Sequence, residues 1–447
     1  MIANKRLPIS ALHLLARCAI VLLLLLAFAL RISLFHIVTS DYTVFLSQWY
    51  DFIQTHGGFT AFKYSFSNYN VPYLYLLAIA TYLPIPKLIA IKTISVLFDG
   101  VLGLFAYLIL SLKFRRSYAA AIGVLVILFA PTIVINGSAW GQADAVYAAF
   151  CLGSLYFLLK ERPAWACLFF GLAISFKLQA IFFLPILLVL ALRRKLPLRY
   201  LALIPAVFLL MLLPAFIAGR DAWSLLTIYF GQITGTGTGI VGQFTNRPFN
   251  GGGNGAFGSG RFNGGGNFGG GFSSSSLTLN APSIYQWFPA NAPAAWQWLG
   301  ITLAALVVVA VGVMLLVSKK QITSSIILKV ALVFAIAIPF LLPEMHERYF
   351  YLADLISIIY AFYVPRRWFI AVIMQLCSLF SYMPYLINTQ IISLGLLAFG
   401  VLAIAIVAFV DLVMELLPGI QRWRKLSLFV DEQVPASQND GLIEANK

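Results

Sequence analysis

The side chains of this sequence that could do chemistry stand in loops between long apolar segments. Only 10% of the residues are charged. Asp41 lies in the sequence SDY, Asp144 ends NGSAWGQAD, Lys177 lies in AISFKLQA, and Arg348 lies in MHERYFY. A carboxylate can accept a proton from a hydroxyl group, and fixed cations can stabilise a leaving group that gains negative charge. The pattern therefore indicates acid–base chemistry beside an anion-binding site.

Asp41 has two interpretations. Asp is a favoured N-cap residue, so Asp41 could simply begin the helix that follows it. We prefer the second interpretation, in which Asp41 is a general base. Aromatic surroundings that exclude water raise the pKa of a carboxylate, which improves a base. Asp51 and Asp144 are the next candidates.

The composition indicates that these loops belong to a membrane protein. The sequence is 61% hydrophobic, its mean hydropathy is +0.91, and apolar runs of about 20 residues alternate with Lys/Arg clusters. We expect an all-α polytopic membrane protein with about 12 transmembrane helices and with interfacial helices in the first outer loop. Segment 71–83 is short for a crossing, so we expect it to lie on the outer interface. The expected crossings are 14–37, 88–112, 118–135, 145–159, two within 164–192, 200–217, 296–317, 325–342, 349–363, 368–385 and 391–417.

This count places every multi-basic cluster on the cytoplasmic side, as the positive-inside rule requires. Both termini are then cytoplasmic, and the N-terminal apolar run is expected to be an uncleaved helix rather than a signal peptide. We expect one transmembrane domain, residues 1–425, and a cytoplasmic tail, residues 426–447. Within the domain, the Gly-rich outer loop at about 246–276 is expected to be disordered, because glycine repeats bury almost no surface.

The charge pattern also excludes some functions. The net charge of +15 falls in small clusters between apolar runs, so we expect no nucleic-acid partner. The Gly-rich tract lacks the strand–loop–helix context of a nucleotide site. Asp99 lies within a predicted crossing and is expected to pair with a neighbouring helix. Because the remaining polar groups collect at the outer face, an enzyme is favoured; the alternative is a transporter or flippase of a lipid-linked glycan.

Four motifs in order resemble the GT-C superfamily of polytopic glycosyltransferases. They are SDY at 40–42, YNVPYLYLL at 69–77, NGSAWGQAD at 136–144 with AISFKLQA at 173–180, and MHERYFY at 345–351. The resemblance extends over about residues 14–385. It is nearest to the glucosyltransferases that use dolichol-phosphate-glucose and to the GPI-anchor mannosyltransferases. Thr43 stands where the eukaryotic first-loop motif has a second acid, so we expect no required metal.

The resemblance implies transfer of a hexose, mannose or glucose, from a polyprenyl-phosphate sugar, with inversion and with Asp41 as general base. The donor is a co-substrate, and we expect no cofactor. The donor phosphate would be bound by Arg348, His346 and Lys177, although these residues could instead be interfacial anchors. Tyr42, Gln142, Asp144 and Glu347 would bind substrate; Asp144 could equally cap a helix.

The resemblance also implies the partners. They are the lipid bilayer, the polyprenyl-phosphate hexose, and a glycan, lipid-linked or protein acceptor on the outer or lumenal face. A bacterial plasma membrane is preferred over an endoplasmic reticulum membrane because the loops are compact.

Overall fold

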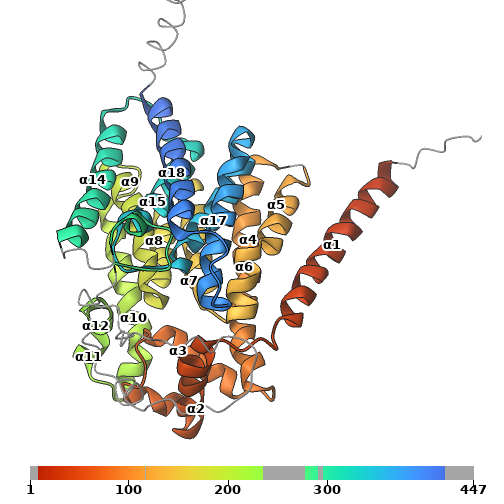
Figure 1. The fold of residues 1–447 in the computed structure, drawn as a ribbon, viewed down its shortest axis with the longest axis vertical. Coiled ribbons are helices and arrows are strands. Elements are labelled where there is room, and N and C mark those ends of the chain that lie inside the picture. Colours follow the sequence, from red (N-terminus) through yellow and green to blue (C-terminus); the bar gives the residue numbers. More distant parts are fainter. Residues whose placement is uncertain (1–8, 116, 235–276, 290–294, 418–447) are drawn as a thin grey trace, which may run out of the picture.

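A computed structural model describes residues 9–115, 117–234, 277–289 and 295–417 of the chain (Figure 1). These residues are almost entirely helical, and their only sheet pairs two strands of two residues each. The all-α prediction is therefore confirmed for the described residues. The predictions for the Gly-rich loop at 246–276 and for the tail at 426–447 lie outside them.

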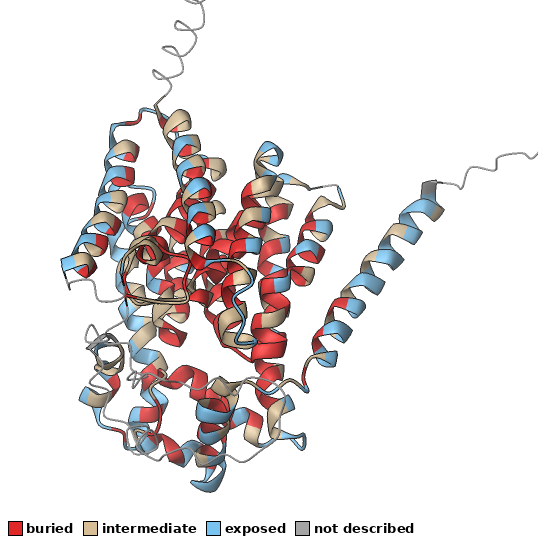
Figure 2. Ribbon diagram, in the orientation of Figure 1, coloured by how far each residue is buried: buried red, intermediate tan, exposed pale blue. Residues whose placement is uncertain are grey.

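The first helix, α1 (Ile9–Ser33), leans away from the other helices (Figure 1). Figure 2 shows that most of its length is exposed. It is attached near its C-terminal end by Arg31, whose Nε lies 2.7 Å from Asp99 Oδ2 and whose Nη1 donates to the carbonyl of Leu128 at 2.8 Å. Both charged side chains are fully buried. The expected pairing of Asp99 with a neighbouring helix is thus observed.

The segment after α1 folds into short helices at one end of the bundle (Figure 1). In α3, Asn70 caps the helix by accepting a hydrogen bond from the backbone N–H of Val71, and Pro72 suits the first helical turn. The segment predicted at 71–83 is therefore helical but only 11 residues long. These elements are η1 (Tyr42–Leu46), α2 (Ser47–Thr55), η2 (Gly58–Lys63) and α3 (Val71–Thr81).

A long helix, α4, begins the main bundle and packs against α5 and α7. The chain bends by 55° between 119–129 and 131–140, because Pro131 cannot continue the helix that precedes it. Residues 135–140 pack against α4 and α7. The elements are α4 (Lys87–Lys113), α5 (Ala119–Phe129), α6 (Pro131–Val134), η3 (Ile135–Trp140), α7 (Asp144–Leu159), α8 (Pro163–Phe176), η4 (Leu178–Phe183), α9 (Leu184–Leu192), η5 (Leu198–Ala202), α10 (Leu203–Ile217), α11 (Ala222–Leu226) and α12 (Ile228–Thr234).

The C-terminal half adds five long or medium helices to the bundle. Thr323 caps α15 and Ser393 caps α18 through their side-chain oxygens. The two short strands pair in parallel, with Thr278 opposite Met345 and Leu279 opposite His346. The elements are β1 (Thr278–Leu279), η6 (Ile284–Trp287), α14 (Ala295–Val317), α15 (Ser324–Leu341), β2 (Met345–His346), η7 (Glu347–Phe350), α16 (Tyr351–Tyr363), η8 (Pro365–Arg367), α17 (Trp368–Leu386) and α18 (Leu394–Leu416).

Among the described residues, seven helices are long and apolar enough to cross a membrane, or eight if the bent pair 119–140 counts as one span. Every segment predicted to cross is helical, but those formed by α7, α8, α9 and α16 are shorter than 18 residues. The expected number of twelve crossings is therefore not confirmed and stays a prediction.

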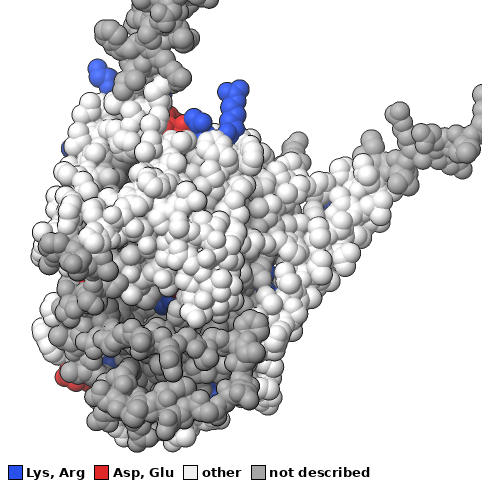
Figure 3. All heavy atoms as spheres, viewed as in Figure 1, with Lys and Arg blue, Asp and Glu red and all other residues white. Residues whose placement is uncertain are grey.

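Two basic residues at helix ends donate to backbone carbonyls at the ends of other helices. Arg193 donates to the carbonyls of Leu315 and Ser318, both at 2.7 Å, and Lys113 donates to the carbonyl of Tyr363 at 2.5 Å. In Figure 3 the Lys and Arg side chains that protrude most from this face lie at the top of the bundle. The gathering of all basic clusters on one side of a membrane, and which side that is, stay predictions.

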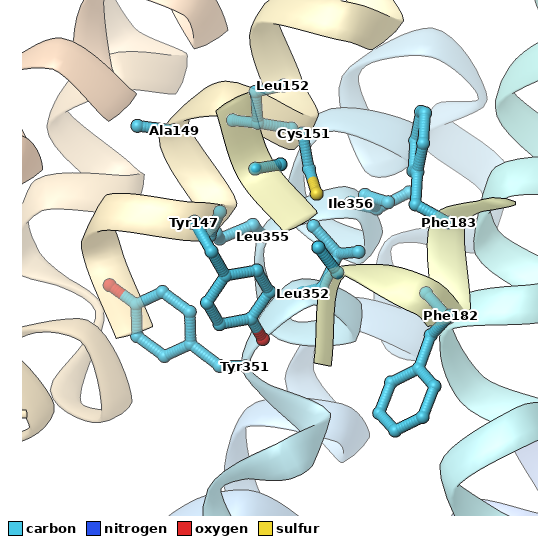
Figure 4. Close-up of a cluster of buried hydrophobic side chains, with 14 of the residues drawn as sticks. Tyr147, Ala149, Cys151, Leu152, Phe182, Phe183, Tyr351, Leu352, Leu355 and Ile356 are labelled. Atoms are coloured by element: carbon cyan, nitrogen blue, oxygen red, sulfur yellow. The ribbon is translucent and has the colours of Figure 1, made fainter. Parts of the chain in front are cut away.

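The helices that carry the candidate site meet in a buried apolar cluster (Figure 4). Tyr147 and Leu152 of α7, Phe183 of η4, and Tyr351 and Leu355 of α16 lie together there, and all five are fully buried or nearly so. Asp144 begins α7 and Arg348 lies just before α16. This packing therefore fixes the two ends that present those charged side chains.

Candidate active site

The carboxylate of Asp41 is held by neutral hydrogen-bond donors. Asp41 stands at the N-cap position before η1, yet its side chain makes no capping hydrogen bond. Its Oδ2 instead accepts hydrogen bonds from Trp140 Nε1 at 2.8 Å and from Gln142 Nε2. The side chain is 17% exposed, so the carboxylate is still within reach of a ligand. This arrangement disfavours the helix-cap interpretation.

Trp140 packs against an aromatic ring and a cation. Tyr385 stacks on its ring, with the ring centroids 4.8 Å apart, and Arg348 Cζ lies 5.4 Å from the ring centroid. Thr39 Oγ1 donates to the carbonyl of Trp140 at 3.1 Å. A guanidinium group over an aromatic face gains a cation–π interaction. Trp140 thus positions both the carboxylate of Asp41 and the cation beside it.

Arg348 lies among three carboxylates. Its Nη1 is 3.7 Å from Asp41 Oδ2 and 3.7 Å from Glu347 Oε1, and its Nε is 4.0 Å from Asp144 Oδ2. These separations are longer than hydrogen bonds, and the buried Nε has no hydrogen-bond acceptor. A buried N–H without an acceptor is costly. The guanidinium group is therefore able to take an oxygen atom of an anionic ligand.

A second ion pair lies close to Arg348. Lys177 Nζ pairs with Asp144 Oδ1, and Asn136 Nδ2 donates to Asp144 Oδ2 at 2.9 Å. Asp144 is the first residue of α7, and both of its carboxylate oxygens have partners in this cluster. Burial lowers the pKa of Lys177, but the Asp144 carboxylate outweighs burial, and the net pKa lies above the ordinary value. Lys177 is therefore charged at neutral pH.

The two residues before Arg348 titrate unusually. Burial raises the pKa of Glu347 to about 7, against the opposing charge of Arg348. Burial lowers the pKa of His346 well below its ordinary value, and the cations Arg348 and Lys177 lower it further. The imidazole of His346 is consequently neutral at pH 7. It can offer a phosphate one hydrogen bond but no charge, which revises the sequence-based expectation for this residue.

The chain beyond the Gly-rich tract lies beside this motif. The backbone N–H of Glu344 donates to the carbonyl of Leu277 at 2.8 Å, and Asn280 forms a bridge with His346. Glu344 adopts a left-handed conformation, with φ of 59°, which turns the chain into β2. The described segment 277–280 therefore borders the site at His346.

Polar residues on one face of α4 form hydrogen bonds to the segments that carry the site. Lys92 Nζ donates to the carbonyls of Ile37 at 2.5 Å and Ala139 at 3.0 Å. Ser95 Oγ donates to the carbonyl of Gln142 at 2.7 Å. These bonds tie the chain before Asp41 to the loop that carries its two donors. Gly141 has φ of 81°, a left-handed conformation that suits glycine.

The structure brings most predicted site residues together and leaves others at the edge. Asp41, Gln142, Asp144, Lys177, Glu347 and Arg348 share the cluster, with His346 at its rim, where 32% of its side chain is exposed. Tyr42 packs against the core and, among the described residues, makes no side-chain hydrogen bond to the carboxylates. Asp51, the reserve candidate base, pairs with Lys87 at 2.7 Å in an exposed position.

Three residues shape the site in roles that sequence reasoning did not assign to them. Trp140 and Asn136 were inside the quoted loop motif, but nothing in the sequence showed that they donate to Asp41 and Asp144. Lys92 lay inside a predicted crossing, where any ionisable residue suggests a function. That signal could have identified it. In the part of the chain that the structure describes, no group of three or more His, Cys, Asp or Glu side chains is arranged to hold a metal ion.

The chain is similar to glycosyltransferase family 87, whose family model matches residues 66–263. The match spans fewer than half of the 447 residues. Asp144 and Lys177 lie inside it, and Asp41 and Arg348 lie outside. No curated protein matches the chain. Together with the seven long apolar helices, the match supports a membrane glycosyltransferase.

Proposed function

We propose that this protein transfers a hexose from a polyprenyl-phosphate sugar to an acceptor hydroxyl, with inversion at the anomeric carbon. The acceptor is a lipid-linked or surface glycan or a protein, on the outer or lumenal face of the membrane. A bacterial plasma membrane is the preferred location. One observation carries the proposal. The Asp41 carboxylate, held by two hydrogen-bond donors, lies 3.7 Å from the guanidinium group of Arg348, whose buried Nε has no hydrogen-bond acceptor.

The chemistry assigns one role to each of these two groups. The acceptor oxygen attacks the anomeric carbon, and its proton passes to Asp41. The bond from that carbon to the phosphate oxygen breaks, and the electron pair leaves with the polyprenyl phosphate. Arg348 stabilises the negative charge that grows on the phosphate, and a planar guanidinium group suits phosphate oxygens. No cofactor is needed for this step.

The neighbouring residues take supporting roles. Lys177 adds a second cation for the donor phosphate, and the neutral His346 adds a hydrogen bond. Gln142 orients Asp41 and, with Tyr42, Asp144 and Glu347, lines the place for the sugar and acceptor hydroxyls. Asp144 also balances the charges of Arg348 and Lys177, which limits the cost of burying three charges together.

The proposal is tested by incubating purified protein with a panel of polyprenyl-phosphate sugars. We expect one donor, carrying mannose or glucose, to raise the melting temperature and to be consumed when a suitable acceptor is present. The polyprenyl phosphate without a sugar should raise the melting temperature less. Stabilisation without sugar transfer to any acceptor, combined with movement of a lipid-linked glycan across a vesicle membrane, would contradict the proposal and indicate a flippase.

A further inference from the structure

Arg220 is a buried cation that the chemistry above does not use. The residue is only 3% exposed, and its one side-chain hydrogen bond runs from Nη2 to Ser65 Oγ at 3.0 Å. Its Nε and Nη1 are buried and have no hydrogen-bond acceptor. A guanidinium group carries five N–H donors, so at least three of them are unused.

The turn that ends α10 explains why Arg220 points inward. Gly219 has φ of 99°, and the backbone N–H of Arg220 donates to the carbonyl of Ala215 at 3.1 Å. This is the pattern of a helix that ends with a glycine in the left-handed region and folds the next residue back. The arginine side chain is thus directed toward Ser65, between α10 and the first loop.

No carboxylate of the described chain compensates this charge. Arg220 is absent from all the ion pairs of the described residues. The neighbouring Asp221 uses its carboxylate to cap α11, accepting from the N–H of Ser224 at 2.7 Å. The sequence from 235 to 276, which follows α12, contains no Asp or Glu. The C-terminal end of α10 favours a cation, but that effect is small beside the cost of burying an unpaired ion.

The surroundings of Arg220 suit a membrane–water boundary. Phe216 and Ile217 at the end of α10 and Trp223 in α11 are more than half exposed, and they continue the apolar surface of a helix that is almost unburied. In Figure 1 this end of α10 lies with α11 and α12 beside the short helices of the first loop. Apolar and aromatic side chains so placed occupy the headgroup level of a bilayer.

A second cation stands close to the turn. A Cβ on Gly219 would lie 3.8 Å from Lys63 Cβ, and Lys63 itself is exposed, with Nζ 4.8 Å from the centroid of the Tyr64 ring. Lysine and arginine together suit a phosphate, whose several oxygens accept from donors in different directions.

We propose that Arg220, with Ser65 and Lys63, binds a phosphate group at the membrane–water boundary, apart from the Asp41 cluster. The phosphate belongs either to a phospholipid headgroup or to a soluble phosphate compound. The inference does not depend on the proposed transfer reaction.

The test is thermal unfolding of the full chain in a phosphate-free detergent. One arm adds inorganic phosphate and the other adds phosphatidylglycerol, with chloride at matched ionic strength as reference. Each arm is also run with the Arg348→Ala variant. This variant distinguishes phosphate binding at Arg220 from phosphate binding at the Asp41 cluster. We expect at least one arm to raise the melting temperature, with an affinity about tenfold weaker in Arg220→Met. The arm that responds identifies the source of the phosphate.

Arg199→Met is the matched control, because Arg199 is an exposed arginine at the other end of the same helical segment. It should keep the full response. If Arg220→Met does not fold, Arg220→Lys replaces it, and its affinity should be reduced as well because lysine lacks the guanidinium donors. The proposal is overturned if neither arm stabilises the wild-type chain, or if the folded Arg220 variant responds as the wild type does.

Discussion

At the scale of single residues, the site depends on how Asp41 and Arg348 are kept apart and yet close. Trp140 and Gln142 donate to Asp41 from one side, so the carboxylate does not have to pair tightly with the guanidinium group. The distance of 3.7 Å leaves Arg348 with capacity for another anion. A base and a phosphate binder can therefore act within the same small space without neutralising each other.

Arg348→Ala should weaken donor binding by about 10- to 100-fold and lower turnover, because it removes charge-assisted hydrogen bonds to the phosphate. Arg348→Lys should restore only part of both, since a point charge replaces a planar group. Binding of the donor and rates of sugar transfer are measured at equal amounts of folded protein. Unchanged donor affinity in Arg348→Ala would remove the residue from the donor site.

Glu347 predicts a pH dependence of stability. Its pKa rises from 4.5 to about 7 on folding, so between these values the folded protein binds more protons than the unfolded one. The free energy of unfolding should therefore fall as pH rises from 5 to 7, by roughly 2 kcal/mol for this group. Glu347→Gln should remove that part of the slope, as measured by denaturation at each pH. An identical slope in the variant would contradict the assignment.

Much of the site could be predicted from the sequence, because its charged residues are few and stand at helix ends. Asp41, Asp144, Lys177 and Arg348 were each selected in this way. The neutral partners were not, since an indole or an amide in a loop gives no sign of which carboxylate it will reach. Tyr42 was selected only for its position next to Asp41.

At the scale of elements, α4 supports the site. Three polar residues stand at helical spacing on this helix, and each contacts a different segment. Lys92 bonds to the chain that follows α1, Ser95 bonds to the loop around Trp140, and Asp99 pairs with Arg31 of α1. Such spacing places side chains on one face of a helix.

Lys92→Met should therefore lower turnover by ~10²-fold, because small displacements of catalytic groups are costly, while donor affinity stays nearly unchanged. Lys92→Arg should recover part of the loss. The matched control is Lys87→Met on the same helix, where Lys87 is paired with Asp51 in an exposed position. The separate measurement of turnover and donor binding distinguishes loss of positioning from general unfolding. Equal losses in both lysine variants would show that Lys92 has no special role.

The helices themselves were predictable from apolar runs, but their lengths as membrane crossings were not. Hydropathy does not show that Pro131 bends a span by 55°, or that α8 ends before Lys177 so that η4 can begin. These interruptions bring Asn136 and Lys177 to Asp144. The local breaks that lowered the number of long helices are the same ones that build the site.

At the scale of the whole molecule, the described chain has a basic end and a site-bearing end. The sequence predicts that the site-bearing end faces outward. Cysteine at position 87 should react with a membrane-impermeant reagent added outside, and cysteine at position 113, at the opposite end of α4, should not. Labelling is measured in intact cells or sealed vesicles. Reaction at position 113 alone would show that the predicted orientation in the membrane is wrong.

The central claim is that Asp41 is the base of a sugar transfer, and one comparison tests it most directly. Asp41→Asn keeps the size of the side chain but cannot accept the proton; Asp51→Asn is the matched control in the same loop. Turnover of the polyprenyl-phosphate sugar should fall by ~10²–10⁴-fold in Asp41→Asn, with donor affinity retained, and should be nearly unchanged in Asp51→Asn. Full turnover in Asp41→Asn would contradict the claim.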